Sequence, residues 1–409
     1  MEADASNASN AAAEHARAET EWSDRLAELQ SANDQQSAEL AELRVSVDAS
    51  EKALAEAQST AEASISRANA ERDDARSEAQ SARNERDDAI AARASAEALR
   101  AQALADKAGV TAEEVLPFST GVIGEPLPVA KIVAALDDAL AEVSESRWPE
   151  AAEGIMTTDT RPKGASRQVR LGEHTVSISG ISKGAGMIRP NMATMLGFIA
   201  TDARIEPGLL QSLASELGEA SFNRITVDGD TSTNDACMLV ATGQYGGPEV
   251  AADSPELPVL REALKAVYLE LAHAIVRDGE GATKFVTIDV RNAASQAEAL
   301  DVAYAVAHSP LVKTALFASD PNWGRILAAV GRAGVSDLDL QALEIYLGDV
   351  CLVRNGGRAE DYSEARGQAV MNQEEVTITI DLRRGEVRET VWTCDFSHDY
   401  VTINAEYRT

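Results

Sequence analysis

The first 107 residues contain neither glycine nor proline, the two residues that interrupt helices most effectively. They are dense in Ala, Glu, Asp and Arg, a composition typical of long helices rather than of a packed domain. We therefore predict an acidic, Ala-rich helical segment over residues 1–107. A heptad pattern predicts a coiled coil, or an extended helix that needs a partner; an acidic tail with fluctuating helix is the alternative. The heptad core positions are Trp22, Leu26, Leu29, Asn33, Gln36, Leu40, Leu43, Val47, Ser50, Leu54, Ala57 and Ala61.

Charge and cysteine content limit the functions open to the chain. The formal net charge is −30 at pH 7 and the pI is about 4.5. Phosphate binding needs clustered Lys and Arg, so we exclude a nucleic-acid partner. No run of eighteen uncharged apolar residues and no secretory leader pattern is found, so we expect a cytoplasmic protein without a membrane partner. Cys237, Cys351 and Cys394 are widely spaced and indicate neither disulfides nor a zinc site, and no metal or cofactor is expected.

The composition changes at Gly109, after which Gly and Pro recur and apolar residues alternate with polar ones. Strands and helices alternate, and the last two strands suggest an antiparallel pair around residues 383–386. This mixture predicts an α+β fold for residues 108–409. The predicted strands are Val176–Ile181, Thr226–Asp228, Phe285–Val290, Leu343–Val353, Val376–Leu382 and Val387–Trp392, and the predicted helices are Val129–Val143, Pro207–Ala220, Leu257–Val276 and Glu298–Ala307.

The segment from Lys183 to Leu196 is the most informative for chemistry. Its glycines permit tight turns and close approach of a ligand, and Thr194 follows a small residue and precedes an apolar run. A threonine hydroxyl is a poor nucleophile without an adjacent base. Cleavage of the Ala193–Thr194 bond would free the α-amine of Thr194, whose pKa near 8 suits a base close to neutrality. Composition alone leaves open an ordinary threonine at the start of a strand.

Seven blocks, in order along the chain, together resemble one family, the bifunctional ornithine acetyltransferase / glutamate N-acetyltransferase family of arginine biosynthesis. Seven ordered blocks over about 300 residues are far more specific than a single short motif. The resemblance implies a layered α/β sandwich of the N-terminal-threonine-nucleophile type. The blocks are residues 119–128 (STGVIGEPLP), 156–160 (MTTDT), 183–196 (KGAGMIRPNMATML), 223–235 (NRITVDGDTSTND), 279–284 (GEGATK), 320–325 (DPNWGR) and 400–407 (YVTINAEY).

What the resemblance implies for this chain can be written residue by residue. The chain would cut itself between Ala193 and Thr194, and the resulting α- and β-chains would assemble into a hetero-oligomer. Thr194 would take the acetyl group of N-acetylornithine and pass it to glutamate in a ping-pong reaction. Thr120 and Gly121 correspond to the oxyanion-hole donors, and acetyl-CoA is a further candidate substrate. The implied substrate-binding residues are Thr157, Lys183, Thr194, Glu280, Asn404 and Thr409.

The remaining motifs give weaker evidence for a functional site. Residues 228–235 resemble a calcium loop, but Thr233 replaces the required Gly and Leu239 the bidentate Glu, so we interpret them as a hydrogen-bonded turn. Residues 279–284 lack the spacing of a phosphate-binding loop. His308 and Ser309 have no catalytic partner pattern and are interpreted as structural.

The chain departs from the family at its N-terminal side. Family members normally begin with several strands and an Asn-Ser-Gly-Asn-Ala loop, and the acidic helical segment stands in their place. The helix is then an appended oligomerisation arm, the strands come from another chain, or the domain is incomplete. Two further functions therefore stay open: a hydrolase with an N-terminal nucleophile on the same fold, and a coiled-coil interaction protein with an inactive enzyme domain.

Overall fold

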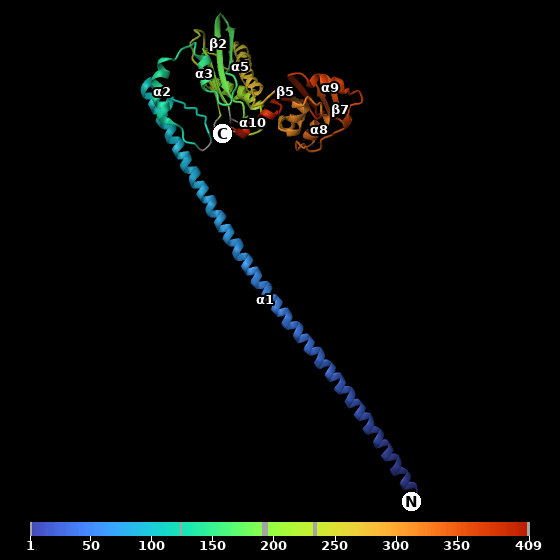
Figure 1. Cartoon of the computed structure of the whole chain (residues 1–409). Helices are drawn as coiled ribbons and strands as arrows, with labels where there is room; N and C mark the ends of the chain where they lie inside the picture. Colours follow the sequence, from blue (N-terminus) through green and yellow to red (C-terminus); the bar gives the residue numbers. More distant parts are fainter. Residues whose placement is uncertain (1, 123–124, 190–194, 232–234, 407–409) are drawn as a thin grey trace. The chain divides into compact units, whose positions relative to one another are not determined.

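A computed structural model describes residues 2–122, 125–189, 195–231 and 235–406. The chain divides between Ala92 and Arg93 into two compact units. Helix α1 (Glu2–Ala108, blue in Figure 1) forms the whole described part of the first unit and continues into the second. It ends just before Gly109, at the position where the composition changes. None of the described helices is long and apolar enough to cross a membrane.

The last turns of α1 belong to the second unit. Ala101 and Ala105 are buried there, and Arg100 donates a hydrogen bond of 2.7 Å from Nη1 to Ser119 Oγ. This contact fixes the segment that leads to Thr120. Helix η1 (Ala112–Glu114) lies before Thr120 in the chain, and helices α2 (Val129–Ala141) and α3 (Trp148–Gly154) follow it.

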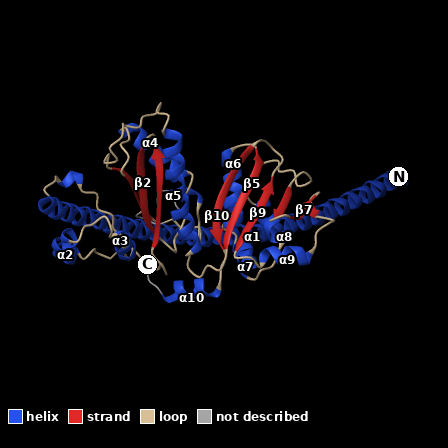
Figure 2. Ribbon diagram, turned by 90° about the horizontal axis from the view of Figure 1, so that it is seen from above, coloured by secondary structure: helices blue, strands red, loops and turns tan. Residues whose placement is uncertain are grey.

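The first sheet of the second unit has the strand order β1-β2-β3-β4. The first three strands are antiparallel, and β4 runs parallel to β3. Helix α5 (Leu257–Arg277) packs on β1 and β2, and α4 (Pro207–Glu219) packs on β4, which closes one hydrophobic cluster (Figure 2). The strands are β1 (Lys163–Leu171), β2 (His174–Lys183), β3 (Leu196–Thr201) and β4 (Ala236–Ala241).

The second sheet has the order β10-β5-β9-β6-β7-β8 and encloses a second cluster. Helices α6 (Gln296–Ala307), α8 (Trp323–Gly331) and α9 (Glu364–Met371) pack on this sheet, and α7 (Pro310–Phe317) packs on α6 and α8 (Figure 2). Its strands are β5 (Phe285–Ala293), β6 (Glu344–Leu347), β7 (Val350–Arg354), β8 (Gly357–Arg358), β9 (Glu375–Asp381) and β10 (Val387–Cys394). Helix α10 (His398–Glu406) follows β10. Two mixed sheets with packed helices confirm the predicted α+β class.

Two of the predicted strands are wrong in detail. Residues 226–228 form no strand: the pairing stops at an isolated parallel bridge between Ile225 and Trp392, and the carboxylate of Asp228 then accepts from three backbone amides of a turn. The predicted strand Leu343–Val353 is the hairpin β6–β7, which turns at residues 348–349. The turn residues Gly348 and Asp349 are a two-residue hairpin signal, and Gly348 adopts φ +58, so the local sequence did indicate this turn and the prediction overlooked it.

The predicted antiparallel pairing of the last two strands is also wrong. β5 lies between them, parallel to β9 and antiparallel to β10. The connecting loop crosses the end of β5, where Arg384 and Gly385 both donate backbone hydrogen bonds to the carbonyl of Asn292, at 2.7 and 2.8 Å. The apolar strand β5 has buried side chains on both faces, so it gains more from a central position than from an edge.

Candidate active site

Strand β2 ends at Lys183, the lysine of the Gly-rich segment. Its side chain is buried, and Nζ lies 3.5 Å from Thr120 Oγ1, which is long for a hydrogen bond. Burial lowers the pKa of Lys183, and the carboxyl groups of Asp159 and, when ionised, Asp235 oppose that shift. The lysine therefore faces the predicted oxyanion-hole threonine from a strand 63 residues further along the chain.

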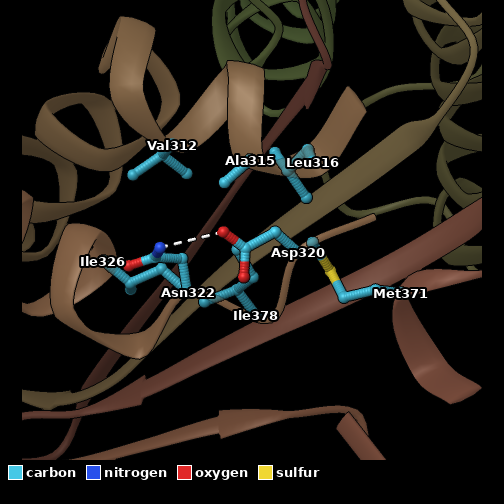
Figure 3. A pocket seen from close by; sticks show the side chains of 8 residues that line it. All are labelled: Val312, Ala315, Leu316, Asp320, Asn322, Ile326, Met371 and Ile378. Atoms are coloured by element: carbon cyan, nitrogen blue, oxygen red, sulfur yellow. Dashed lines mark hydrogen bonds between the residues drawn. The ribbon is translucent and has the colours of Figure 1, made fainter. Parts of the chain in front are cut away.

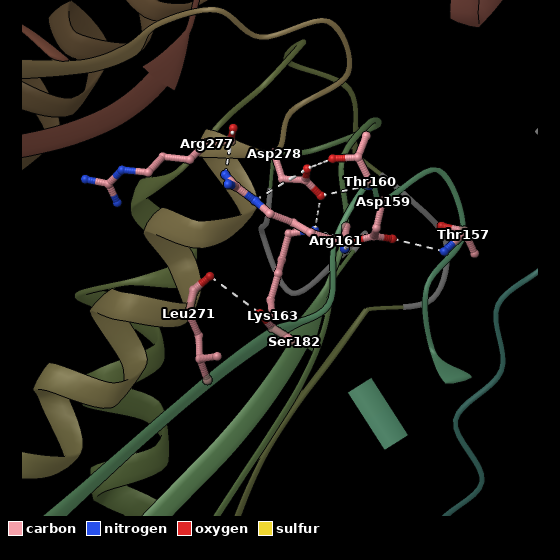
Figure 4. A network of polar contacts seen from close by, with 10 residues as sticks. Thr157, Asp159, Thr160, Arg161, Lys163, Ser182, Leu271, Arg277 and Asp278 are labelled. Carbon is pink, nitrogen blue, oxygen red and sulfur yellow. Dashed lines mark hydrogen bonds and ion pairs between the residues drawn. The ribbon is translucent and has the colours of Figure 1, made fainter. Parts of the chain in front are cut away.

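The next backbone group, the amide of Gly184, donates to a buried ionic network (Figure 4). Asp159 accepts this bond at 2.7 Å and a second one from the amide of Thr157 at 3.0 Å. The ammonium of Lys163 lies 2.5 Å from Asp159 Oδ1 and 2.5 Å from Asp278 Oδ2. Burial alone would raise the pKa of Asp159, but the hydrogen bonds and the charge of Lys163 hold it below its usual value. The network fixes Thr157 to the end of β2.

A second carboxylate, Glu280, packs against the same loop. Its amide donates to the carbonyl of Ala185 at 2.8 Å, and its buried side chain covers Gly186. A Cβ on Gly186 would overlap the Glu280 carboxyl group, so a side chain at position 186 would displace that carboxyl group. Asn404 Nδ2 in α10 donates to Glu280 Oε2 at 2.8 Å. Two implied substrate-binding residues from distant blocks therefore meet directly.

The loop that carries Glu280 also holds helix α10. Gly281 has φ +67, and a Cβ there would lie 2.5 Å from both the hydroxyl of Ser397 and the amide of Tyr400. On the other side of the loop, Asp395 accepts hydrogen bonds of 2.8 Å from the amides of Thr283 and Lys284. These contacts place the last described helix against the loop at residues 279–284, and Glu280 of that loop contacts the Gly-rich loop.

Asp228 shapes the far end of that loop. Its carboxylate accepts from the amides of Met187 at 2.6 Å, Ile188 at 3.0 Å and Asp230 at 3.1 Å. Met187 adopts φ +54, a conformation uncommon for residues with a side chain. Burial raises the pKa of Asp228 despite these bonds. The hydrogen-bonded turn predicted for residues 228–235 is confirmed at Asp228.

A cavity of about 130 Å³ adjoins the start of β3. Met195, Asp235 and Cys237 line it, together with residues of α4. Burial raises the pKa of Asp235 to about 8, against the opposing effects of the Met195 amide and the charge of Lys183. Asp235 is therefore mainly protonated at neutral pH.

The structure brings together five of the predicted site residues: Thr120, Thr157, Lys183, Glu280 and Asn404. Gly121 follows Thr120, and the side on which a Cβ would project is open. Ala193, Thr194 and Thr409 lie outside the described residues. The roles of all nine residues stay predictions.

Two residues of the block at 320–325, Asp320 and Asn322, line a small cavity with side chains of α7, α8, α9 and β9 (Figure 3). Asn322 caps α8 by accepting from the amide of Arg325 at 3.1 Å, and it donates to Asp320 at 2.9 Å. The adjacent cavity measures only about 10 Å³. His308, interpreted as structural, lies 3.0 Å from the hydroxyl of Thr226, and burial lowers its pKa to about 4.

Sequence reasoning missed the residues that organise the site: Asp159, Lys163, Asp278 and Asp395. Asp159 lay inside a recognised block and Asp278 immediately before one, so proximity to the blocks was an available signal. The pairing of Lys163 with Asp278 joins positions 115 residues apart, and nothing in the local pattern indicates it.

Fold and site together define an α+β protein with a polar site at a strand end, built from a Gly-rich loop, a buried lysine and a carboxylate. Comparison with known proteins gives the family. The ArgJ family model matches residues 88–409. The arginine biosynthesis bifunctional proteins ArgJ of Pseudomonas fluorescens (strain Pf0-1) and Pseudomonas syringae pv. tomato (strain DC3000) are 62% and 61% identical to the chain over 302 residues, which are 74% of this chain and 75% of each relative.

A solved structure supports the same family. The crystal structure of the arginine biosynthesis bifunctional protein ArgJ from Bacillus halodurans is similar with a TM-score of 0.50 and 39% identity, over 52% of this chain and 100% of that chain. The chain belongs to the ArgJ family. The predicted family and enzyme class, a glutamate N-acetyltransferase of arginine biosynthesis, are thereby confirmed.

Proposed function

We propose that this enzyme moves an acetyl group from N-acetylornithine to glutamate through an acetyl-Thr194 intermediate. Self-cleavage before Thr194 first frees its α-amine. The Thr194 hydroxyl then attacks the acetyl carbonyl carbon while its proton passes to that amine, and ornithine leaves with the proton on its own nitrogen. The amine of glutamate attacks the acetyl-threonine by the reverse steps and restores the free hydroxyl.

The contacts joining Thr120, Thr157, Lys183, Glu280 and Asn404 are the observation that carries this proposal. Both substrates are amino acids, and each end of such a molecule finds a complementary group here. Lys183 supplies a cation for the carboxylate, and Glu280 supplies an acceptor for the amine of ornithine. Thr120 and the amide of Gly121 supply donors for the oxyanion of the tetrahedral intermediate, an interaction worth about 2.7–4 kcal/mol for one donor.

Intact-mass measurement tests the first step. We expect wild-type protein to yield two polypeptides that separate at the Ala193–Thr194 bond, and the Thr194→Ala variant to stay whole. An active wild-type preparation with that bond intact would contradict the mechanism, because the threonine would lack its base.

Substrate turnover tests the second step. Incubation of the cleaved enzyme with N-acetylornithine should release ornithine in quantity only when glutamate is present. Ornithine release at the same rate without glutamate would identify a hydrolase instead. Replacing N-acetylornithine by acetyl-CoA in the same assay determines whether the chain also accepts that second donor.

The proposal extends to assembly and location. The two polypeptides stay together as a hetero-oligomer, because strand β2 of the first pairs with strand β3 of the second over six residue pairs. We place the enzyme in the cytoplasm with its small-molecule substrates, and it requires no cofactor.

A further inference from the structure

Helix α1 carries a stripe of large apolar side chains that face solvent. Trp22, Leu26, Leu29, Leu40, Leu43, Val47 and Leu54 are each between 52% and 74% exposed. Exposed apolar surface of this extent on one helix face marks an interaction site. The acetyltransferase chemistry does not use it.

The heptad core positions alternate strictly between spacings of four and three residues from Trp22 to Ala61; the stripe fills most of them, and polar Asn33, Gln36 and Ser50 fill three. That is the a/d pattern of a two-stranded coiled coil, with Leu26, Leu40, Val47 and Leu54 at a positions. Carboxylates end the pattern on both sides: Glu19 takes the preceding a position, and Glu71 and Glu78 take later d positions. Like charges facing each other across a seam repel, so the pattern confines pairing to residues 22–61, about 60 Å of helix.

Two further features select the partner and its direction. Asn33 occupies an a position, where a buried asparagine favours pairing with its own copy in one register. Glu39 occupies the g position and Arg44 the following e position, which face each other between parallel chains in register. Within the described residues neither side chain forms an ion pair in its own helix, and both are exposed. In a pair of identical helices this match occurs twice.

We propose that residues 22–61 bind a second copy of this chain as a parallel, in-register coiled coil. The apolar stripes of the two copies form the seam, Asn33 meets Asn33, and Glu39 of each helix pairs with Arg44 of the other. The contact is isologous, so it closes at two copies.

Disulfide crosslinking in the full chain tests pairing and direction together. In a parallel register the two copies of residue 47 face each other, whereas Val45 lies on the outer face and is 69% exposed. We expect the Val47→Cys variant to form a covalent dimer on mild oxidation at least tenfold faster than the Val45→Cys variant. Wild-type protein gives the background from its native cysteines.

Equal crosslinking of the two variants at the wild-type level would overturn the proposal. An antiparallel pair, a different protein partner or an unpaired helix would each give that result, because none of them brings the two copies of residue 47 together.

Charge exchange tests the register by an independent route. In the Val47→Cys background, Glu39→Arg should slow crosslinking, because two Arg side chains then face each other. The double exchange Glu39→Arg with Arg44→Glu should restore the rate. A double variant no faster than the single one would contradict the assigned pairing.

Discussion

Buried charge at single residues connects the fold of this enzyme to its site. Lys163 is fully buried between Asp159 and Asp278, and it links the start of β1, the loop after α3 and the end of α5. Such an ion pair stabilises only when both charges are present and hydrogen-bonded. Here Asp159 also accepts from the backbone of the Gly-rich loop, so loss of the lysine would disturb the site as well as the core.

We therefore predict that Lys163→Met destabilises the protein by about 3–5 kcal/mol, because it leaves two carboxylates buried without a cation. Urea unfolding measures the loss. The matched control is Lys131→Met at an exposed position, which should change the free energy of unfolding by less than about 0.5 kcal/mol. Equal effects of the two substitutions would show that the Lys163 network is not a stabilising unit.

Asp235 should make stability depend on pH in an unusual direction. Its folded-state pKa of about 8 lies above its ordinary value of 3.8, so the native state holds a proton that the unfolded chain releases. Between these two values the contribution of this group to stability falls as pH rises. Asp235→Asn mimics the protonated form, and at pH 8 it should stabilise the protein by about 1–3 kcal/mol, allowing for partial solvent exposure.

Thermal or urea unfolding at pH 5 and at pH 8 measures this effect. The stabilisation should be clearly smaller at pH 5, where wild-type Asp235 is already protonated. Asp253→Asn, at an exposed position, should show no such difference. A stabilisation independent of pH would mean that Asp235 titrates normally.

At the scale of elements, the loop at residues 279–284 and helix α10 form one working part. Gly281 permits the close contact between them, and Glu280 and Asn404 are placed by it. Glu280 also donates its backbone amide to Ala185, so the loop at residues 279–284 connects α10 to the Gly-rich loop that follows β2.

We predict that Gly281→Ala displaces α10 from the loop, because φ is positive there and a Cβ would overlap Ser397 and Tyr400. Stability should fall by about 1–3 kcal/mol, and kcat/KM for N-acetylornithine should fall about 10- to 100-fold, because Asn404 moves away from Glu280. Steady-state kinetics and urea unfolding measure both. Gly331→Ala at the exposed end of α8, where a Cβ would meet no atom within 4 Å, should leave kcat/KM unchanged.

At the scale of the whole molecule, all buried apolar residues of the two clusters lie within residues 93–409. The described residues of the first unit form one helix, in which the side chains of residues 15–88 are exposed and belong to neither cluster. The candidate active site therefore lies in the second unit, and the exposed apolar stripe lies in the first.

Deletion of residues 1–92 should leave a folded enzyme whose kcat/KM equals that of the full chain, because both clusters and the described site remain complete. Unfolding of the truncated protein in urea should occur at an unchanged midpoint. A truncated protein that is unfolded would show that the second unit depends on the helix.

Much of the site could be predicted from the sequence, because the seven ordered blocks identified the family without reference to the fold. The long helix followed equally directly from the absence of Gly and Pro before Gly109. Helices α2, α4, α5 and α6 were predicted within a few residues, since their apolar periodicity and caps are local properties of the chain.

Only the tertiary structure decided which strands are neighbours and which charges pair. β5 lies between β9 and β10 because burial of side chains on both of its faces outweighs the short connection that favoured a hairpin. Lys163 is held by carboxylates 4 and 115 residues away, and the second of these contacts exists only after α5 has packed on β1. Local sequence fixes the identity of helices and reactive segments because their energies arise between near neighbours, whereas strand order and buried ion pairs depend on contacts that the chain makes only once it is folded.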